Sequence, residues 1–175
     1  MIKQLCCVIF LFLASCTCPG IIGDAMTDQD FVTVHGLNIH PQGNWVSQDE
    51  IERATEMFTL DVASFLPCQY AEEHIREIYL QNIHIYVEED EFQCRLKQGY
   101  TYCKGTYKGG EIHYVNEDCI GDSAFVHEML HLLNARIEGF HDHHHIKIRF
   151  WGDNDHSLEH IINENIKEHY CPSCW

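Results

Sequence analysis

The feature that most constrains the fold is a segment, Phe125–Glu138, in which apolar residues are interrupted by polar ones at regular intervals. The apolar members are Phe125, Val126, Met129, Leu130, Leu132, Leu133 and Ile137. The polar exceptions fall at i, i+4, i+7 and i+11, one narrow stripe along a helix, and are His127, His131, Asn134 and Glu138. A helix that is apolar over most of its surface packs in the middle of a domain. The sequence therefore predicts a central helix here, with Gly139 as its stop.

Two histidines of this stripe, with the glutamate beside the first, have the spacing of a zinc site. His127 and His131 lie one turn apart on one face, so both imidazoles can reach one Zn²⁺ at about 2.0–2.1 Å. Glu128 is offset by a fraction of a turn, which keeps it off the metal but near a metal-bound water. Zinc lowers the pKa of such a water to about 7, and a carboxylate can then take its proton. Burying these three polar groups is costly unless something satisfies them, and a metal does.

The pattern His127-Glu128-Met129-Leu130-His131 resembles the HExxH motif of the zincin metallopeptidases. That resemblance covers residues 83–165 and implies hydrolysis of peptide bonds, with Glu128 as general base. It also implies an edge strand that lies across the cleft above the helix and pairs with extended substrate, and Glu111–Val115 is the expected strand. The metzincin subfamily is excluded, because it would need Gly and His where this chain has Asn134 and Ile137.

A catalytic zinc commonly has three protein ligands, so the sequence must supply one more. The tract after Gly139 offers His145, which Asp142 could aim back at the metal by capping a turn. Asp142 itself looks like the aspartate of the aspzincin element Gly-Thr-x-Asp, with Phe140 in place of Thr. Glu159 or Glu164 would resemble the gluzincins. We expect His145 or Asp142 as the third ligand and the other as an orienting group; the remaining histidines of the tract, His141, His143 and His144, are expected to be solvated.

Two further roles stay open from the sequence. Zincins often place a Tyr or His opposite the glutamate to stabilise the transition state, and the candidates are Tyr114, His113, His156 and His160. The main rival to a peptidase is a non-catalytic surface lipoprotein that captures zinc through its histidines, of which the chain has 14. A third possibility is a surface protein that is stabilised by disulfides and binds no metal. Only the predicted burial of the motif helix argues against this possibility.

The beginning of the chain predicts export. Lys3 and the apolar run from Leu5 to Ala14 form a signal peptide that is too short to span a bilayer. Residues 13–16, Leu-Ala-Ser-Cys, resemble the lipobox of bacterial lipoproteins, which implies cleavage after residue 15 and a lipid on Cys16. The protein would then be an outer-membrane or cell-surface lipoprotein that contacts the membrane only through this anchor. The alternative is a secretory signal cut near Gly20.

The cysteines agree with an oxidising compartment, where they should pair. Cys94 and Cys103 flank a Gly-containing stretch and could close a hairpin, and Cys68 could be tied to Cys119. Cys171 and Cys174 are expected to form a local disulfide.

The remaining elements predict one α+β domain, residues 30–175, after a signal peptide (1–15) and a tether (16–29). Strands are expected at residues 31–34, 37–39, 83–87 and 111–115, and helices from a Ser47 cap to Pro67, over 72–80, from a cap at Asp122 or Ser123 to 138, and over 158–169. The expected architecture is zincin-like, a small mixed sheet packed on the central motif helix and stabilised by disulfides.

The charge balance narrows the partners. Lys and Arg number 11 against 27 Asp and Glu, a formal charge of −16, so nucleic acid and anionic lipid surfaces would repel the chain. A peptide or protein substrate remains as the expected partner, and Zn²⁺ as the cofactor.

Overall fold

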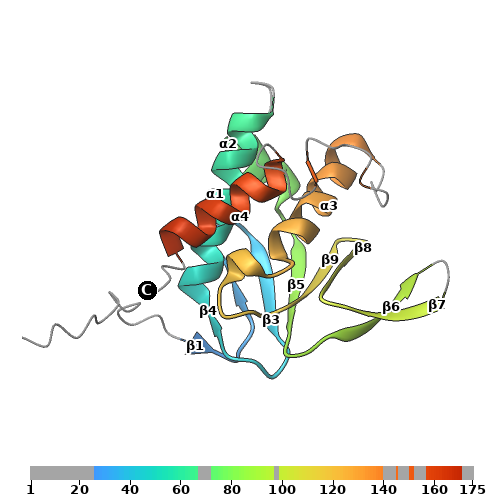
Figure 1. Cartoon of the computed structure of the whole chain (residues 1–175). Coiled ribbons are helices and arrows are strands. Elements are labelled where there is room, and N and C mark those ends of the chain that lie inside the picture. The colour runs from blue at the N-terminus through green and yellow to red at the C-terminus, as the bar shows by residue number, and fades with distance from the viewer. Residues whose placement is uncertain are drawn as a thin grey trace, which may run out of the picture.

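A five-stranded mixed sheet forms the centre of the molecule (Figure 1). The structure, a computed structural model, describes residues 26–66, 72–96, 99–139, 145, 150–151 and 157–170. In spatial order the strands are β2 (Phe31–Val32), β3 (Leu37–Pro41), β5 (Ile83–Glu88), β9 (Glu111–Val115) and β8 (Gly105–Lys108). The three inner strands are parallel, while β2 and β8 are antiparallel to their neighbours. The expected α+β class with a small mixed sheet is confirmed.

The two faces of the sheet differ because side chains alternate along each strand. In β5, Ile83, Ile85 and Val87 are fully buried, while His84 and Tyr86 point the other way. The buried face packs against the helices, and we call the opposite one the outer face. Histidine and tyrosine rings stack there in a row across three strands, from His40 to Tyr86 to His113.

Helices cover the buried face (Figure 1). They are α1 (Gln48–Phe65), α2 (Glu72–His74) with a π-helical turn (Ile75–Tyr79), a 3₁₀ turn (Ile120–Asp122), α3 (Phe125–Glu138) and α4 (Leu158–Tyr170). α4 packs on both α1 and α3, and α3 packs on β8 and β9. The motif helix α3 is therefore central, as its sequence predicts. Within the described residues, none of the helices is long and apolar enough to cross a membrane.

The first turn of α1 is held by a side-chain cap and is linked to the turn before α3. Ser47 caps the helix as expected, its Oγ accepting the backbone N–H of Glu50 at 3.0 Å. The Glu50 carboxylate would return to the cap in a complete capping box. It accepts instead the backbone N–H of Ile120 at 2.9 Å, which fixes the turn before α3 to α1.

The ends of α3 are close to those expected. Gly139 has the left-handed backbone (φ 74°) of a C-terminal stop, as predicted. At the other end Ser123 Oγ accepts the N–H of Phe125 at 3.2 Å, but the cap position belongs to Ala124. Asp122 lies in the 3₁₀ turn and has no part in the cap.

The prediction of Glu111–Val115 as the edge strand is wrong. β9 is an inner strand between β5 and β8, and β8 is the edge. The misplacement arose because residues 88–110 were expected to contain only a hairpin closed by Cys94 and Cys103 and no further strand. They form the hairpin of β6 (Phe92–Leu96) and β7 (Gly99–Cys103), and then β8, whose sequence Gly-Thr-Tyr-Lys is too short and polar to be recognised as a strand.

The Cys94–Cys103 disulfide ties β6 to β7, as expected, and agrees with an oxidising compartment. Cys119 is disulfide-bonded too. Its expected partner Cys68, the cysteines of the chain end and the lipobox Cys16 lie outside the described residues. A small antiparallel pair, β1 (Met26–Thr27) with β4 (Val46–Ser47), flanks the start of α1.

Candidate metal centre

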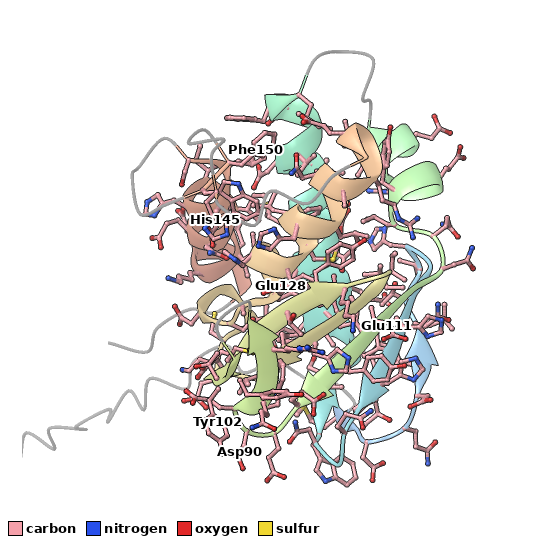
Figure 2. All side chains as sticks on the ribbon, turned by 90° about the vertical axis from the view of Figure 1, so that its right-hand side faces the viewer. Asp90, Tyr102, Glu111, Glu128, His145 and Phe150 are labelled. Atoms are coloured by element: carbon pink, nitrogen blue, oxygen red, sulfur yellow. A yellow bond between two sulfur atoms is a disulfide. The ribbon has the colours of Figure 1, made fainter. Side chains whose placement is uncertain are left out.

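Three imidazoles converge beside α3, and together they could hold a metal ion. They belong to His127 and His131 on α3 and to His145 in the segment that follows it, and their ligand atoms all lie within 4.8 Å of one another. Figure 2 shows His145 beside this helix and Glu128 where the helix meets the sheet. The structure thus brings together the two motif histidines and His145, as the sequence predicts. Asp142, the other expected ligand, lies outside the described residues.

The spacing of the three rings fits tetrahedral coordination. Ligand atoms about 2.0–2.1 Å from a tetrahedral zinc are about 3.3–3.4 Å apart. Nε2 of His131 lies 3.2 Å from Nε2 of His127 and 3.3 Å from Nε2 of His145. The ring centroids form a nearly equilateral triangle with sides of 4.8, 4.9 and 5.2 Å. A ring nitrogen can make only one hydrogen bond, as donor or as acceptor. Nε2 of His131 has two such neighbours, so a cation fits this arrangement better than hydrogen bonds alone.

His145 has an unusual backbone. Its φ is 50°, a left-handed conformation that non-glycine residues adopt rarely. Such conformations cost free energy and concentrate at functional sites, where the surrounding structure holds them. The conformation brings the imidazole of His145 to the pair on α3.

A carboxylate from α4 orients the first histidine. Oε1 of Glu159 lies 2.8 Å from Nδ1 of His127, so Nδ1 carries the proton and Nε2 faces Nε2 of His131. Burial lowers the pKa of His127, but the hydrogen bond to Glu159 and the charges of Glu159 and Glu128 outweigh it and raise the pKa overall. Glu159 therefore lies behind a candidate ligand, and the gluzincin-like alternative in which Glu159 itself binds the metal does not fit this contact.

Glu128 is a buried carboxylate that interacts electrostatically with His127 and has an exposed fraction of 5%. Burial raises its pKa to about 7; the charge of His127 opposes this rise, the charge of Glu159 adds to it, and the backbone N–H of Tyr107 opposes it by donating to the carboxylate. Glu128 thus lies between α3 and the edge strand β8. That position was not readable from the motif alone.

Gly105 allows β8 to approach the motif helix closely. A Cβ at this position would lie 2.6 Å from Cβ of Ala124 and 2.7 Å from Oε1 of Glu128, closer than any real contact. Only glycine lets the edge strand lie directly against this part of α3. Sequence reasoning missed Gly105, because its role depends on a contact between distant segments.

Trp151 forms a wall over the three imidazoles. Its ring centroid lies 5.1, 4.5 and 4.6 Å from those of His127, His131 and His145, and the side chain is only 4% exposed. An apolar wall of this kind limits water around a metal and restricts the rings that bind it. The sequence gives one weak signal for it, a tryptophan shortly after the histidine tract.

Two of the four proposed transition-state groups, Tyr114 and His113, are not placed for that role. Tyr114 is fully buried in the core against Phe125. His113 is on the outer face, where its Nδ1 pairs with Glu88 at 2.8 Å. His156 lies outside the described residues, and His160 is on α4, half-buried.

Comparison of the chain with models of protein families, with curated proteins and with solved structures gave no match in any of the three.

Proposed function

We propose that the protein is an exported, zinc-dependent peptidase with a zincin-like centre. The single observation that supports this most is the convergence of His127, His131 and His145 next to the buried carboxylate of Glu128. A site that only stored metal would have no need of a buried acid near His127 that is not itself a ligand. The resemblance of the motif to the zincins supports the same reading.

The imidazoles of His127, His131 and His145 would hold Zn²⁺, with Glu159 fixing the tautomer of the first. When bound, the metal would polarise the scissile carbonyl and lower the pKa of a water. The three neutral nitrogens suit zinc, whereas magnesium and calcium prefer oxygen ligands. Trp151 would keep the centre partly dry, which strengthens electrostatic interactions within it.

Glu128 would accept the proton of the attacking water and pass it to the leaving amine. Its carboxylate is held by the backbone N–H of Tyr107 on β8, so acid and edge strand keep a fixed relation. Buried carboxylates beside a metal site are well suited to general-base work.

An extended substrate would pair with the edge of β8. The backbone N–H of Val115 donates to the carbonyl of Lys104 at 2.8 Å, and in an antiparallel pair such bonding recurs at every second residue. Gly105 and Tyr107 therefore direct backbone groups away from β9. The N–H of Tyr107 already donates to Glu128, so a peptide strand would pair with the backbone groups of Gly105. A peptide strand added there would pass the carboxylate of Glu128, which touches the same strand.

The rival reading, capture of zinc without catalysis, is favoured by the same three histidines but gives Glu128 no role. The two readings separate in a Glu128→Gln variant. This variant should keep the fold and bind zinc as wild type does, while hydrolysis of a peptide library should fall by about 10²–10⁴-fold.

A matched control is Glu138→Gln, an exposed position on the same helix, which should retain activity. Zinc binding without any hydrolysis by wild type, or hydrolysis that survives Glu128→Gln unchanged, would reject the peptidase and favour zinc capture or a contaminant.

A further inference from the structure

A cavity of about 580 Å³ lies between the β6–β7 hairpin and the outer face of the sheet, away from the candidate metal centre. Lys108 and Glu111 are cross-strand partners on that face, as are Thr106 and His113. Their neighbours Ile112 and Tyr114 point into the core, toward the helices. The cavity is thus on the opposite side of the sheet from α3, and the hairpin projects from the body beside it (Figure 1).

The cations of this cavity stand out in an acidic chain. The other described cations mostly pair with acids: Arg53 with Asp49, Arg76 with Glu72, Lys104 with Glu117, and Lys167 with Asp122 and Glu164. Arg95 and Lys108, by contrast, are not within ion-pair distance of any carboxylate in the described part of the chain. Both line this one cavity. The chain has 27 acidic and only 11 basic residues. Two basic side chains in the same cavity that lack a carboxylate partner among the described residues therefore indicate an anionic ligand.

Aromatic rings complete the lining, and one of them is held in place. His113 stacks on Tyr86 with ring centroids 4.5 Å apart, and its Nδ1 is bound by Glu88 at 2.8 Å. The ring centroid of Phe92 lies 5.8 Å from that of His113. Tyr100 contributes a further ring, and this residue is 68% exposed. The Cys94–Cys103 disulfide ties together the two strands that carry Phe92 and Tyr100. An apolar surface is therefore preformed beside the two cations.

We propose that this cavity binds a peptide through a carboxylate next to an aromatic or apolar side chain. Arg95 and Lys108 would hold the carboxylate, the guanidinium through two parallel hydrogen bonds. Phe92, Tyr100 and His113 would contact the side chain. Glu111, which lines the same cavity, can accept a peptide N–H; a free aromatic acid has no such donor, so a peptide satisfies more of the lining.

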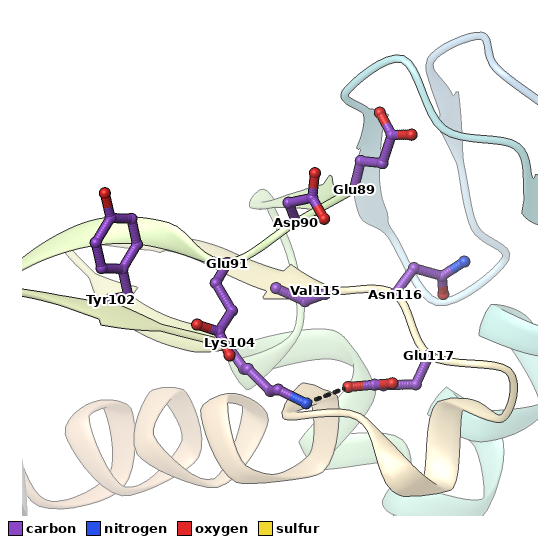
Figure 3. A pocket seen from close by; sticks show the side chains of 8 residues that line it. All are labelled: Glu89, Asp90, Glu91, Tyr102, Lys104, Val115, Asn116 and Glu117. Carbon is purple, nitrogen blue, oxygen red and sulfur yellow. Dashed lines mark hydrogen bonds and ion pairs between the residues drawn. The ribbon is translucent and has the colours of Figure 1, made fainter.

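The neighbouring pocket provides an internal contrast (Figure 3). It is lined by Glu89, Asp90, Glu91 and Glu117, and Nζ of its one lysine, Lys104, lies 2.8 Å from Oε1 of Glu117. Because that cation already has a carboxylate partner, Lys104→Gln is a matched control for Lys108→Gln.

The test is calorimetric binding of N-acetyl-Leu-Phe with a free carboxylate, of its C-terminal amide, and of phenylacetate. Glu128→Gln protein prevents hydrolysis, and zinc-loaded and chelated samples are compared. The acid peptide should bind about tenfold more tightly than the amide, and more tightly than phenylacetate. Arg95→Gln and Lys108→Gln should each weaken the acid about three- to tenfold and leave the amide unchanged, while Lys104→Gln should change neither. Added salt should reduce the preference.

Binding that disappears on chelation would assign the peptide to the metal centre and overturn the proposal. Equal affinity for acid and amide, or an unchanged affinity in both Arg95→Gln and Lys108→Gln, would overturn it as well. Phenylacetate binding as tightly as the peptide would make the ligand a free aromatic acid and reject the peptide. Because no arm depends on hydrolysis, failure here is separate from failure of the proposed peptidase.

Discussion

Glu159 on α4 accepts a hydrogen bond from Nδ1 of His127 on α3, with Oε1 2.8 Å from the nitrogen. This contact ties α4 to the candidate metal centre, since Nε2 of the His127 ring lies 3.2 Å from Nε2 of His131 and its centroid lies 4.9 Å from that of His145. The packing of α4 on α3 and the orientation of a ligand are therefore one structural feature.

Replacement of Glu159 should weaken zinc binding without removing a ligand. Outer-shell partners of this kind typically contribute about 10–100-fold in metal affinity, so Glu159→Ala should show a loss in that range. The zinc affinity of Glu159→Gln should lie between those of wild type and Glu159→Ala, because the amide oxygen can still accept a hydrogen bond from Nδ1–H but carries no charge. Competition with a chromogenic chelator measures the affinity.

The control is Glu164→Ala on the same helix, whose carboxylate is exposed and pairs with Lys167. It should bind zinc as wild type does. Wild-type affinity in Glu159→Ala would mean that the contact is incidental.

His145→Ala should cost more, because it removes a ligand. We expect zinc affinity to fall by more than about 100-fold, beyond the usual effect of an orienting residue. His84→Ala, which removes an exposed imidazole on the outer face, should leave the tight site intact. The same titration of Asp142→Ala tests the role of Asp142. If Asp142 only orients a ligand, its replacement should lower zinc affinity by about 10–100-fold at most. A protein that keeps its zinc in His145→Ala and loses it in Asp142→Ala would transfer the third ligand to the carboxylate.

The sequence predicted the parts of the site that depend on one helix. His127, Glu128 and His131 are fixed relative to one another by helical geometry, and the apolar residues around them reveal that the helix is central. His145 was one of two near-equal choices, because nothing local states which residue of a polar tract turns back toward the metal. The left-handed φ of His145 depends on tertiary contacts, so it cannot be predicted from the residue type.

What the sequence could not show depends on contacts between distant segments. Glu159 was considered as a ligand, whereas its place behind His127 follows only from how α4 packs on α3. β8 was missed because four residues with little apolar alternation give no strand signal, and their pairing with β9 decides their conformation. Trp151 and Gly105 have roles that appear only once the chain has folded around the three histidines.

His35 should contribute to loss of stability in acid. Its side chain is buried, with an exposed fraction of 7%, and its pKa is lowered first by burial and then by the charge of Arg76. The unfolded chain then binds the proton more readily than the folded one. The free energy of unfolding therefore decreases as the pH falls from about 6.5 to the lowered folded-state pKa, and no further below it.

Urea unfolding of chelated protein at pH 7.5 and pH 5 measures this loss. It should be smaller in His35→Gln than in wild type, while the control His84→Gln, at an exposed position, accounts for replacing a surface histidine. An acid loss of equal size in wild type and His35→Gln would contradict the prediction.

Gly105→Ala should separate the metal site from the catalytic geometry. The new Cβ would lie 2.7 Å from Oε1 of Glu128 and 2.6 Å from Cβ of Ala124, so either β8 moves off α3 or the carboxylate shifts. Overpacking of this kind costs about 1–3 kcal/mol of stability. The nearest atoms to this position belong to Ala124 and Glu128 and not to the three imidazoles, so zinc affinity should stay close to wild type while peptide hydrolysis falls. Thr106→Ala, on the same strand but facing outward, controls for a change in β8 itself. Full activity together with wild-type stability in Gly105→Ala would show that the close approach of β8 to Glu128 is not needed for the reaction.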